Sequence, residues 1–181
     1  MEATRIVIVR HPFERVLSAY RDKLEDSQRG SEHGTMHYYR KYGRKIVSEH
    51  RKSNATRKEP TFEEFVEYLI HTDLSLYADD HWLPFYLFCT PCLVDYDFIV
   101  QFETFDEDFQ LLLRRLDAGA SAAGPSWRHV THGGRTSNVA ETYFSKLSKS
   151  SVLQLARKYH LDFQLFNYNV TDYLSMARDD P

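Results

Sequence analysis

The sequence contains no long hydrophobic run, and this bears on the class of protein it encodes. No stretch approaches the ~18 consecutive apolar residues of a membrane-spanning helix, and no signal-peptide pattern precedes Thr4. Cysteine is scarce, with only Cys89 and Cys92 in the motif CTPC. A zinc site would need two further ligands at a suitable spacing, and none stands out, so no metal is expected. No internal repeat or domain boundary is visible, which favours a single α/β domain over residues 1–181.

The chain is rich in aromatic residues, and its charge is unevenly distributed. Hydrophobic residues make up 42% of the 181 positions, and twelve Tyr with twelve Phe argue against disorder. The net charge is −3, but the basic insertion, residues 29–58, carries nine Lys or Arg against Glu32 and Glu49, which is +7. Such a block indicates an anionic partner. A solvated, partly flexible loop is the alternative, and the residue spacing alone favours it.

The segment TRIVIVRHPFERVLSAYRDKLE, residues 4–25, predicts a strand, a sharp turn and a helix. The β-branched run at residues 6–9 is typical of a strand buried on both faces, as in a parallel sheet covered by helices. His11-Pro12 then ends the strand, because proline restricts the residue before it and suits the first turn of a helix. Helical apolar spacing follows at Phe13, Val16, Leu17 and Tyr20.

Three further helices and a second strand are predicted along the chain. The strand is YDFIVQF, residues 96–102, and helices are predicted in PTFEEFVEYLI, FQLLLRRL and VLQLARKYHLDFQLFNY. Gly119 is a stop signal for the second of these helices. Two capping-box patterns mark helix starts: Thr61 with Glu64, and Thr104 with Glu107.

Two polar side chains stand where open α/β sheets bind their ligands. Arg10 ends the first predicted strand, and the carboxyl ends of such strands line the ligand crevice. A guanidinium there offers a fork of donors that matches phosphate. Ser18 follows eight residues later in the predicted helix, where its hydroxyl could reach the same anion. From chemistry alone, an arginine that caps carbonyls and a serine on a neutral helix face are equally consistent.

Four motifs resemble those of one enzyme family. IVIVRHPFERVLSAYRDKLE resembles the 3′-phosphate-binding segment of sulfotransferases that use 3′-phosphoadenosine 5′-phosphosulfate (PAPS), especially the Golgi carbohydrate sulfotransferases of the chondroitin, dermatan and HNK-1 group. DHWLPFYLFCTPC resembles the group's His-Trp and Cys-x-Pro-Cys region, and YDFIVQFETFDEDFQLLL its second strand-to-helix unit. RTS before YFSKL, and then YHLDFQLFNY, resemble its closing segment. The motifs keep the family's order and cover nearly the whole chain.

The resemblance implies a P-loop nucleotide-kinase-like sulfotransferase fold, with a parallel central sheet flanked by helices, and PAPS as the sulfuryl donor. Arg10 and Ser18 would hold its 3′-phosphate. A loop with Arg135, Thr136 and Ser137 would close over the nucleotide, with a simple surface turn as the alternative. The family's 5′-phosphosulfate loop lies upstream of the Arg10 segment, and neither it nor a GxxxxGK equivalent is found here. We therefore expect an N-terminally incomplete domain of a type II membrane protein of the Golgi lumen, whose anchor is not in this chain.

The implied reaction moves a sulfuryl group to a glycan hydroxyl and needs a base. His81 is the first candidate, because it lies in a matched motif beside Trp82, whose ring could stack on a sugar. A packed histidine bonded to backbone is the alternative. Glu103, at the end of the second predicted strand, is the second candidate. Its alternative role is an ion pair with an arginine or with a helix start.

The remaining predicted sites involve the cysteines, the basic insertion and two sequons. A structural disulfide between Cys89 and Cys92 fits an oxidising lumen better than a thioredoxin-like redox pair does. An anionic or amino-sugar glycan would be guided by four side chains of the basic insertion: Arg40, Lys41, Arg44 and Lys45. Nucleic acid competes for any basic patch, but no recognition motif supports it. The sequons place potential glycosylation at Asn54 and Asn169.

Two functional classes therefore remain open. The first is a PAPS-dependent sulfotransferase that acts on a glycosaminoglycan or glycoprotein sugar. The second is a non-catalytic glycan-binding or PAP-binding relative, where PAP is the product nucleotide, adenosine 3′,5′-bisphosphate. The missing 5′-phosphosulfate loop favours the second class, and the intact pair of Arg10 and Ser18 favours the first.

Overall fold

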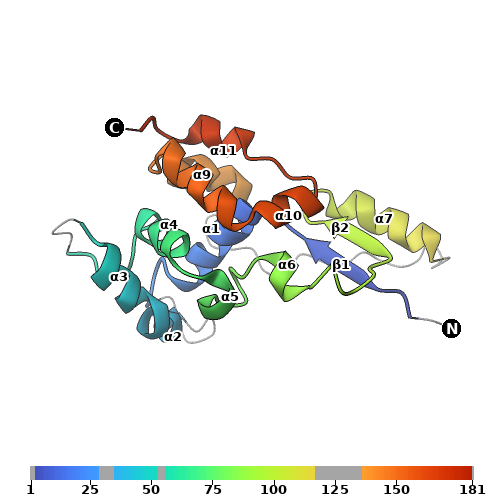
Figure 1. Ribbon diagram of the computed structural model, residues 1–181, viewed down its shortest axis with the longest axis horizontal. Coiled ribbons are helices and arrows are strands. Elements are labelled where there is room, and N and C mark those ends of the chain that lie inside the picture. The colour runs from blue at the N-terminus through green and yellow to red at the C-terminus, as the bar shows by residue number, and fades with distance from the viewer. Residues whose placement is uncertain (1–2, 29–34, 53–55, 117–135, 181) are drawn as a thin grey trace.

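The computed structural model describes residues 3–28, 35–52, 56–116 and 136–180. The elements in chain order are β1 (Ile6–Val9), α1 (Pro12–Lys23), α2 (Thr35–Tyr38), the π-helix η2 (Tyr39–Gly43), α3 (Arg44–His50), α4 (Phe62–His71), α5 (Leu74–Tyr77), α6 (Phe85–Phe88), β2 (Phe98–Gln101), α7 (Phe105–Arg115), the 3-10 helix η3 (Thr136–Val139), α8 (Ala140–Phe144), α9 (Lys149–Lys158), α10 (His160–Leu165) and α11 (Thr171–Met176). Figure 1 shows the strands and α7 toward one end of the molecule, with α2, α3 and α4 toward the other. The fold is α/β, as predicted.

The two predicted strands pair in parallel. Ile6 lies opposite Phe98, and Val9 lies opposite Gln101. Parallel neighbours need a long crossover connection, and here that connection contains helices α1 to α6. The carboxyl ends of both strands therefore meet at one edge of the sheet, next to the start of α1.

The prediction that β1 is buried on both faces is wrong. Val7 and Val9 are buried and pack with Phe166, but Ile6 and Ile8 are 38% and 50% exposed. Within the described part of the chain, the isoleucine face of β1 belongs to no core cluster. A continuous β-branched run shows that a strand is apolar on both faces, but not that both faces are covered.

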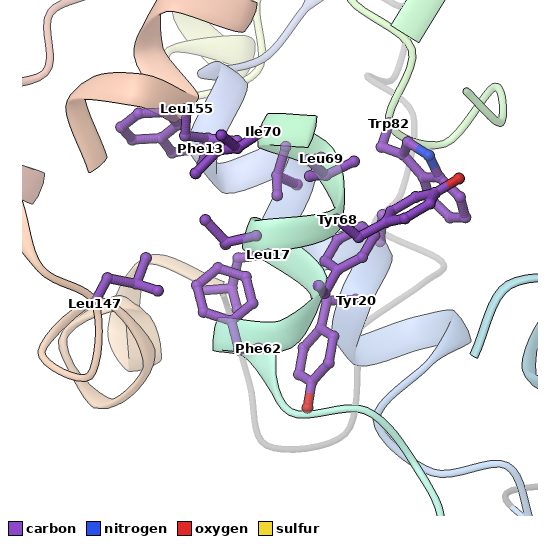
Figure 2. Close-up of a cluster of buried hydrophobic side chains, with 14 of the residues drawn as sticks. Phe13, Leu17, Tyr20, Phe62, Tyr68, Leu69, Ile70, Trp82, Leu147 and Leu155 are labelled. Atoms are coloured by element: carbon purple, nitrogen blue, oxygen red, sulfur yellow. The ribbon is translucent and has the colours of Figure 1, made fainter. Parts of the chain in front are cut away.

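The main core forms around α1 as the apolar spacing predicts. Its Phe13, Val16 and Leu17 are fully buried, and the cluster continues through α4, α8, α9 and α11. Figure 2 shows labelled side chains of α1 and α4 converging in this cluster, with Trp82 at one side. The predicted capping box of α4 is confirmed, because Thr61 and Glu64 exchange side-chain and backbone hydrogen bonds. The core thus anchors α1, which begins two residues after Arg10.

The basic insertion is helical over much of its length, where spacing alone favoured a loop. Its helices are α2, η2 and α3, and Tyr39, Tyr42 and Ile46 are buried on one side of them. Gly43 allows the close approach of Tyr39, because a Cβ at Gly43 would lie 2.8 Å from the Tyr39 ring. The aromatic stripe was present in the sequence, but the charged residues between its members masked it.

Two other local predictions differ from the structure. Thr104 makes no capping box. Its hydroxyl donates to the Asp108 carboxylate at 2.9 Å, which also accepts the Gln101 backbone N–H at 2.8 Å. The last predicted helix is split into α9 and α10 at Tyr159, whose buried hydroxyl donates to the Trp82 carbonyl.

Two further sequence features concern the predicted helix end at Gly119 and the scarcity of long apolar segments. The stop signal at Gly119 lies outside the described residues. None of the helices in the described ranges is both long and apolar enough to span a bilayer.

Candidate active site

Arg10 stands at the carboxyl end of β1, beside the end of β2. Its guanidinium lies over the ring of Phe102, 4.8 Å from the ring centroid, and its Nη2 donates to Glu14 Oε2 at 3.1 Å. Arg10 Nε is buried and has no hydrogen-bond partner among the described residues. A buried charged donor without an acceptor is costly, and such groups mark positions where an ion or ligand supplies the missing partner. The site is therefore suited to an anion.

Glu14 connects Arg10 to the C-terminal part of the chain. The carboxylate is almost fully buried, and its Oε1 accepts the hydroxyl of Tyr173 at 2.9 Å. Burial and the neighbouring Glu14 charge raise the pKa of Tyr173, so this hydroxyl stays protonated and donates. The site thus contains one cation, one carboxylate and one neutral donor, contributed by the β1–α1 turn, α1 and α11.

Ser18 lies on α1, and the part of the predicted closing loop that the structure describes packs against this helix. Ser18 is half-buried and lies four residues after Glu14, so the two share one face of the helix. The 3-10 helix η3, which begins at Thr136, packs against α1. Thr136 is buried and Ser137 is exposed, while Arg135 lies outside the described residues.

Glu103 ties the end of β2 to the start of α1. Its Oε1 accepts the backbone N–H of His11 at 2.8 Å, and its Oε2 accepts the hydroxyl of Tyr168 at 2.8 Å. Burial and the Glu103 carboxylate raise the pKa of Tyr168, which keeps this donor protonated. The helix-start contact considered from the sequence is therefore present. A catalytic role for Glu103 stays a prediction.

His81 forms a second polar centre, in the segment between α5 and α6. Its ring is partly exposed, with 42% of the side chain accessible, and Nδ1 lies 2.6 Å from Asp79 Oδ1. Tyr38 of α2 contributes a hydroxyl 3.2 Å from the same nitrogen. Burial alone would raise the pKa of Asp79, but hydrogen bonds from His81 outweigh it, and the pKa is lowered. When the Asp79 carboxylate accepts Nδ1–H, Nε2 is the ring nitrogen that can take up a proton, which is the arrangement of an oriented general base.

The prediction that Trp82 stacks on a sugar is wrong. Trp82 is 0% exposed, and its ring packs edge-on against Tyr42 and Phe65, with centroids 4.9 and 5.4 Å apart. Consecutive residues in this turn point in opposite directions, so His81 faces solvent while Trp82 fills the core. The half-buried Tyr38, whose ring centroid is 5.4 Å from that of His81, is the aromatic neighbour of the candidate base.

One basic side chain connects the two polar centres through α1. The guanidinium of Arg15 donates to the backbone carbonyls of Leu83 and Asp80 and lies over the Phe85 ring, 4.1 Å from its centroid. Arg15 thereby fixes the segment that carries His81 to the helix that begins beside Arg10. Sequence analysis did not identify Arg15, because its partners are carbonyls far away in the chain.

The four cations predicted to guide a glycan lie on η2 and α3, and all four are exposed: Arg40, Lys41, Arg44 and Lys45. Lys41 reaches the His81 centre, since its Nζ lies 3.8 Å from Asp79 Oδ2. Arg51, by contrast, is bound to Glu64 and serves the fold. The exposed cations and the candidate base thus occupy neighbouring elements.

The structure contains no disulfide between Cys89 and Cys92, which are both free thiols. Cys89 is half-buried and packs beside the Val7 and Val9 cluster, whereas Cys92 is exposed. The two thiols therefore occupy different environments, and the disulfide prediction is not supported. Burial raises the pKa of the Cys89 thiol.

Two remaining predictions concern glycosylation and metals. Asn169 is exposed, while its backbone carbonyl accepts His11 Nε2 at 2.9 Å. Asn54 lies outside the described residues. In the part of the chain that the structure describes, no group of three or more His, Cys, Asp and Glu is placed to hold a metal ion.

The sequence is similar to one protein family and to several of its members. Residues 2–169 match the sulfotransferase family. Carbohydrate sulfotransferase 11 of Rattus norvegicus is 35% identical over 180 residues, which is 95% of this chain and 49% of that protein. Carbohydrate sulfotransferase 8 of Mus musculus is 33% identical over 92% of this chain and 40% of its own length, and carbohydrate sulfotransferase 14 of Danio rerio is 33% identical over 91% and 43%. The chain therefore spans half or less of the length of these relatives. No solved structure matches it significantly.

Proposed function

The chain belongs to the sulfotransferase family, as its motifs indicated, and from this premise we propose that it forms the greater part of a carbohydrate sulfotransferase domain. Its reaction is the transfer of a sulfuryl group from PAPS to a hydroxyl group of a glycan. Its proposed location is the Golgi lumen, within a type II membrane protein. The relatives named above are carbohydrate sulfotransferases, which supports a glycan acceptor.

The observation that carries the proposal is the state of Arg10. Its guanidinium lies at the carboxyl end of the sheet, is held by one oxygen of Glu14, and retains a buried Nε without a partner in the described residues. A phosphate offers several acceptors to such a fork. We assign the 3′-phosphate of the donor to Arg10, with Ser18 contributing its hydroxyl from α1. Thr136 and Ser137 would border the nucleotide from η3, which packs on α1, and Arg135 is proposed to contribute as well.

His81 is the proposed general base. Asp79 holds Nδ1 of the ring, so Nε2 can accept the proton of the acceptor hydroxyl. As the hydroxyl oxygen bonds to sulfur, the bond between sulfur and the bridging phosphate oxygen breaks, and its electron pair leaves with PAP. Glu103 remains the second candidate base. Its two oxygens already accept hydrogen bonds, which favours His81.

The glycan would approach over the basic insertion. Lys41 lies next to Asp79, and the neighbouring exposed cations extend the positive surface away from His81 along η2 and α3. Exposed charges of this kind attract a polyanion at long range and are screened by salt. An anionic glycan is therefore the proposed acceptor class.

Calorimetric titration with PAP tests the nucleotide site. Arg10→Ala is expected to weaken PAP binding by at least about tenfold, because it removes hydrogen bonds to a charged group. Ser18→Ala should have a smaller effect in the same direction. Arg157→Ala, which removes an exposed arginine from α9, is the matched control and should leave the affinity unchanged.

The outcome also separates the two functional classes. PAP binding that depends on Arg10 supports the sulfotransferase proposal. A folded chain that binds a sulfated glycan but not PAP would overturn it and favour a non-catalytic glycan-binding relative.

A further inference from the structure

The two oxygens of Glu14 have different partners. Oε2 accepts Arg10 Nη2 at 3.1 Å, and Oε1 accepts the Tyr173 hydroxyl at 2.9 Å. The Glu14 side chain is 9% exposed, so solvent offers it few other partners. Tyr173 and Arg10 therefore each hold one oxygen of Glu14.

This arrangement limits how strongly Glu14 can hold Arg10. Nε and Nη2 form one edge of the guanidinium fork, and a carboxylate with two open oxygens takes such an edge as a bidentate pair. Here the Tyr173 hydroxyl draws Oε1 to itself, and Glu14 accepts Nη2 alone through Oε2, while Nε has no partner within the described ranges. An arriving phosphate then competes with one hydrogen bond to Glu14 instead of two.

The ring of Tyr173 is fixed independently of its hydroxyl. It stacks on His11 with centroids 4.6 Å apart, and its edge contacts involve Phe13 at 5.2 Å and Phe144 at 4.7 Å. Phenylalanine at this position keeps these contacts and loses only the donor. The hydroxyl can therefore be tested without removing the packing.

We propose that Tyr173 is a positioning residue of the anion site, which keeps Arg10 available to phosphate by occupying one oxygen of Glu14. The proposal rests on the proposed function, since it assumes that Arg10 binds the phosphate. It assigns a role in nucleotide binding to α11, a helix more than 150 residues from Arg10 in the sequence.

The test is a double-mutant cycle on PAP affinity, measured by calorimetry on the full chain. Tyr173→Phe is expected to weaken binding roughly threefold to tenfold, the range of one hydrogen bond. In a Glu14→Gln background, the same change should have little effect, because a neutral amide cannot form the bidentate ion pair. Tyr143→Phe is the matched control: it removes a hydroxyl from Glu25, just beyond α1, and should leave PAP affinity unchanged. Thermal unfolding of each variant checks that it is folded.

The outcomes distinguish the two levels of the proposal. If Arg10→Ala leaves PAP affinity unchanged, the assignment of the phosphate to Arg10 fails, and the role of Tyr173 fails with it. If Arg10→Ala abolishes binding but Tyr173→Phe behaves like Tyr143→Phe, only the role of Tyr173 is overturned. An effect of Tyr173→Phe that is equally large in the Glu14→Gln background would also overturn it, because that effect would not pass through the carboxylate.

Discussion

Glu64→Gln is expected to lower the free energy of unfolding and to weaken the attachment of the basic insertion to α4. Glu64 caps α4 and forms a two-bond pair with Arg51, which immediately follows α3: Nε to Oε1 at 2.8 Å and Nη2 to Oε2 at 2.9 Å. Oε2 also accepts the Thr61 backbone N–H at 2.8 Å. Both side chains are only 10% exposed, so solvent screens the pair weakly. Replacing the charge while keeping the shape should cost about 2–3 kcal/mol of unfolding free energy.

The pH dependence of this loss provides the sharper test. Burial opposes ionisation of Glu64, but the hydrogen bonds from Arg51 and Thr61 outweigh it, and its pKa is lowered from 4.5. The carboxylate therefore contributes stability that is fully present above pH 4.5 and is lost as pH falls through the lowered pKa. Urea unfolding at several pH values should show the difference between wild type and variant shrinking in that window. Glu63→Gln, in the same first turn of α4, should lower the free energy of unfolding by only about 0.5 kcal/mol. Equal losses for the two variants, or a Glu64 effect that does not change with pH, would refute this reasoning.

Three other predictions follow from the site and the core. Asp79→Asn should lower kcat for sulfuryl transfer about tenfold to a hundredfold without changing PAP affinity. Asp80→Asn should change neither quantity. Equal effects of the two variants would argue against a His81 ring that is oriented by Asp79. Glycan binding should depend on the four exposed cations of the basic insertion, Arg40, Lys41, Arg44 and Lys45. Replacing all four by Gln should weaken the binding of a sulfated glycan and reduce its dependence on salt concentration. Unchanged binding at low salt would contradict the proposal that these cations guide the glycan. Tyr159→Phe should cost about 1–2 kcal/mol in urea unfolding, because it leaves the buried Trp82 carbonyl without this donor; no loss would show that the carbonyl finds another partner.

Sequence patterns predicted the features that depend on residues close together in the chain. The run at residues 6–9, the His11-Pro12 break and the Thr61 and Glu64 capping box each specify a local backbone conformation, and the structure contains all three. The position of Arg10 at the end of a parallel strand followed from the same local pattern. The family motif around it then predicted a phosphate as the ligand, which stays a prediction.

Features that depend on distant contacts were missed or misread. Trp82 and His81 are neighbours in sequence, but only the packing of Tyr42 and Phe65 decides which of them is buried. Glu14 and Glu103 likewise each accept a hydrogen bond from a tyrosine of the C-terminal segment. Asp79 could have been found, because a carboxylate two residues before a candidate histidine is a sequence-level signal. Tyr38 and Tyr173 carried no such signal.

The assignment of the 3′-phosphate to Arg10 is tested most directly by phosphorus NMR of PAP during titration with the chain. The 3′- and 5′-phosphate resonances report the two ends of the nucleotide separately. We predict that the 3′-phosphate resonance shifts on binding and that Arg10→Ala removes this shift. A 3′-phosphate resonance that does not move, or that moves equally with the wild type and with Arg10→Ala, would contradict the central claim.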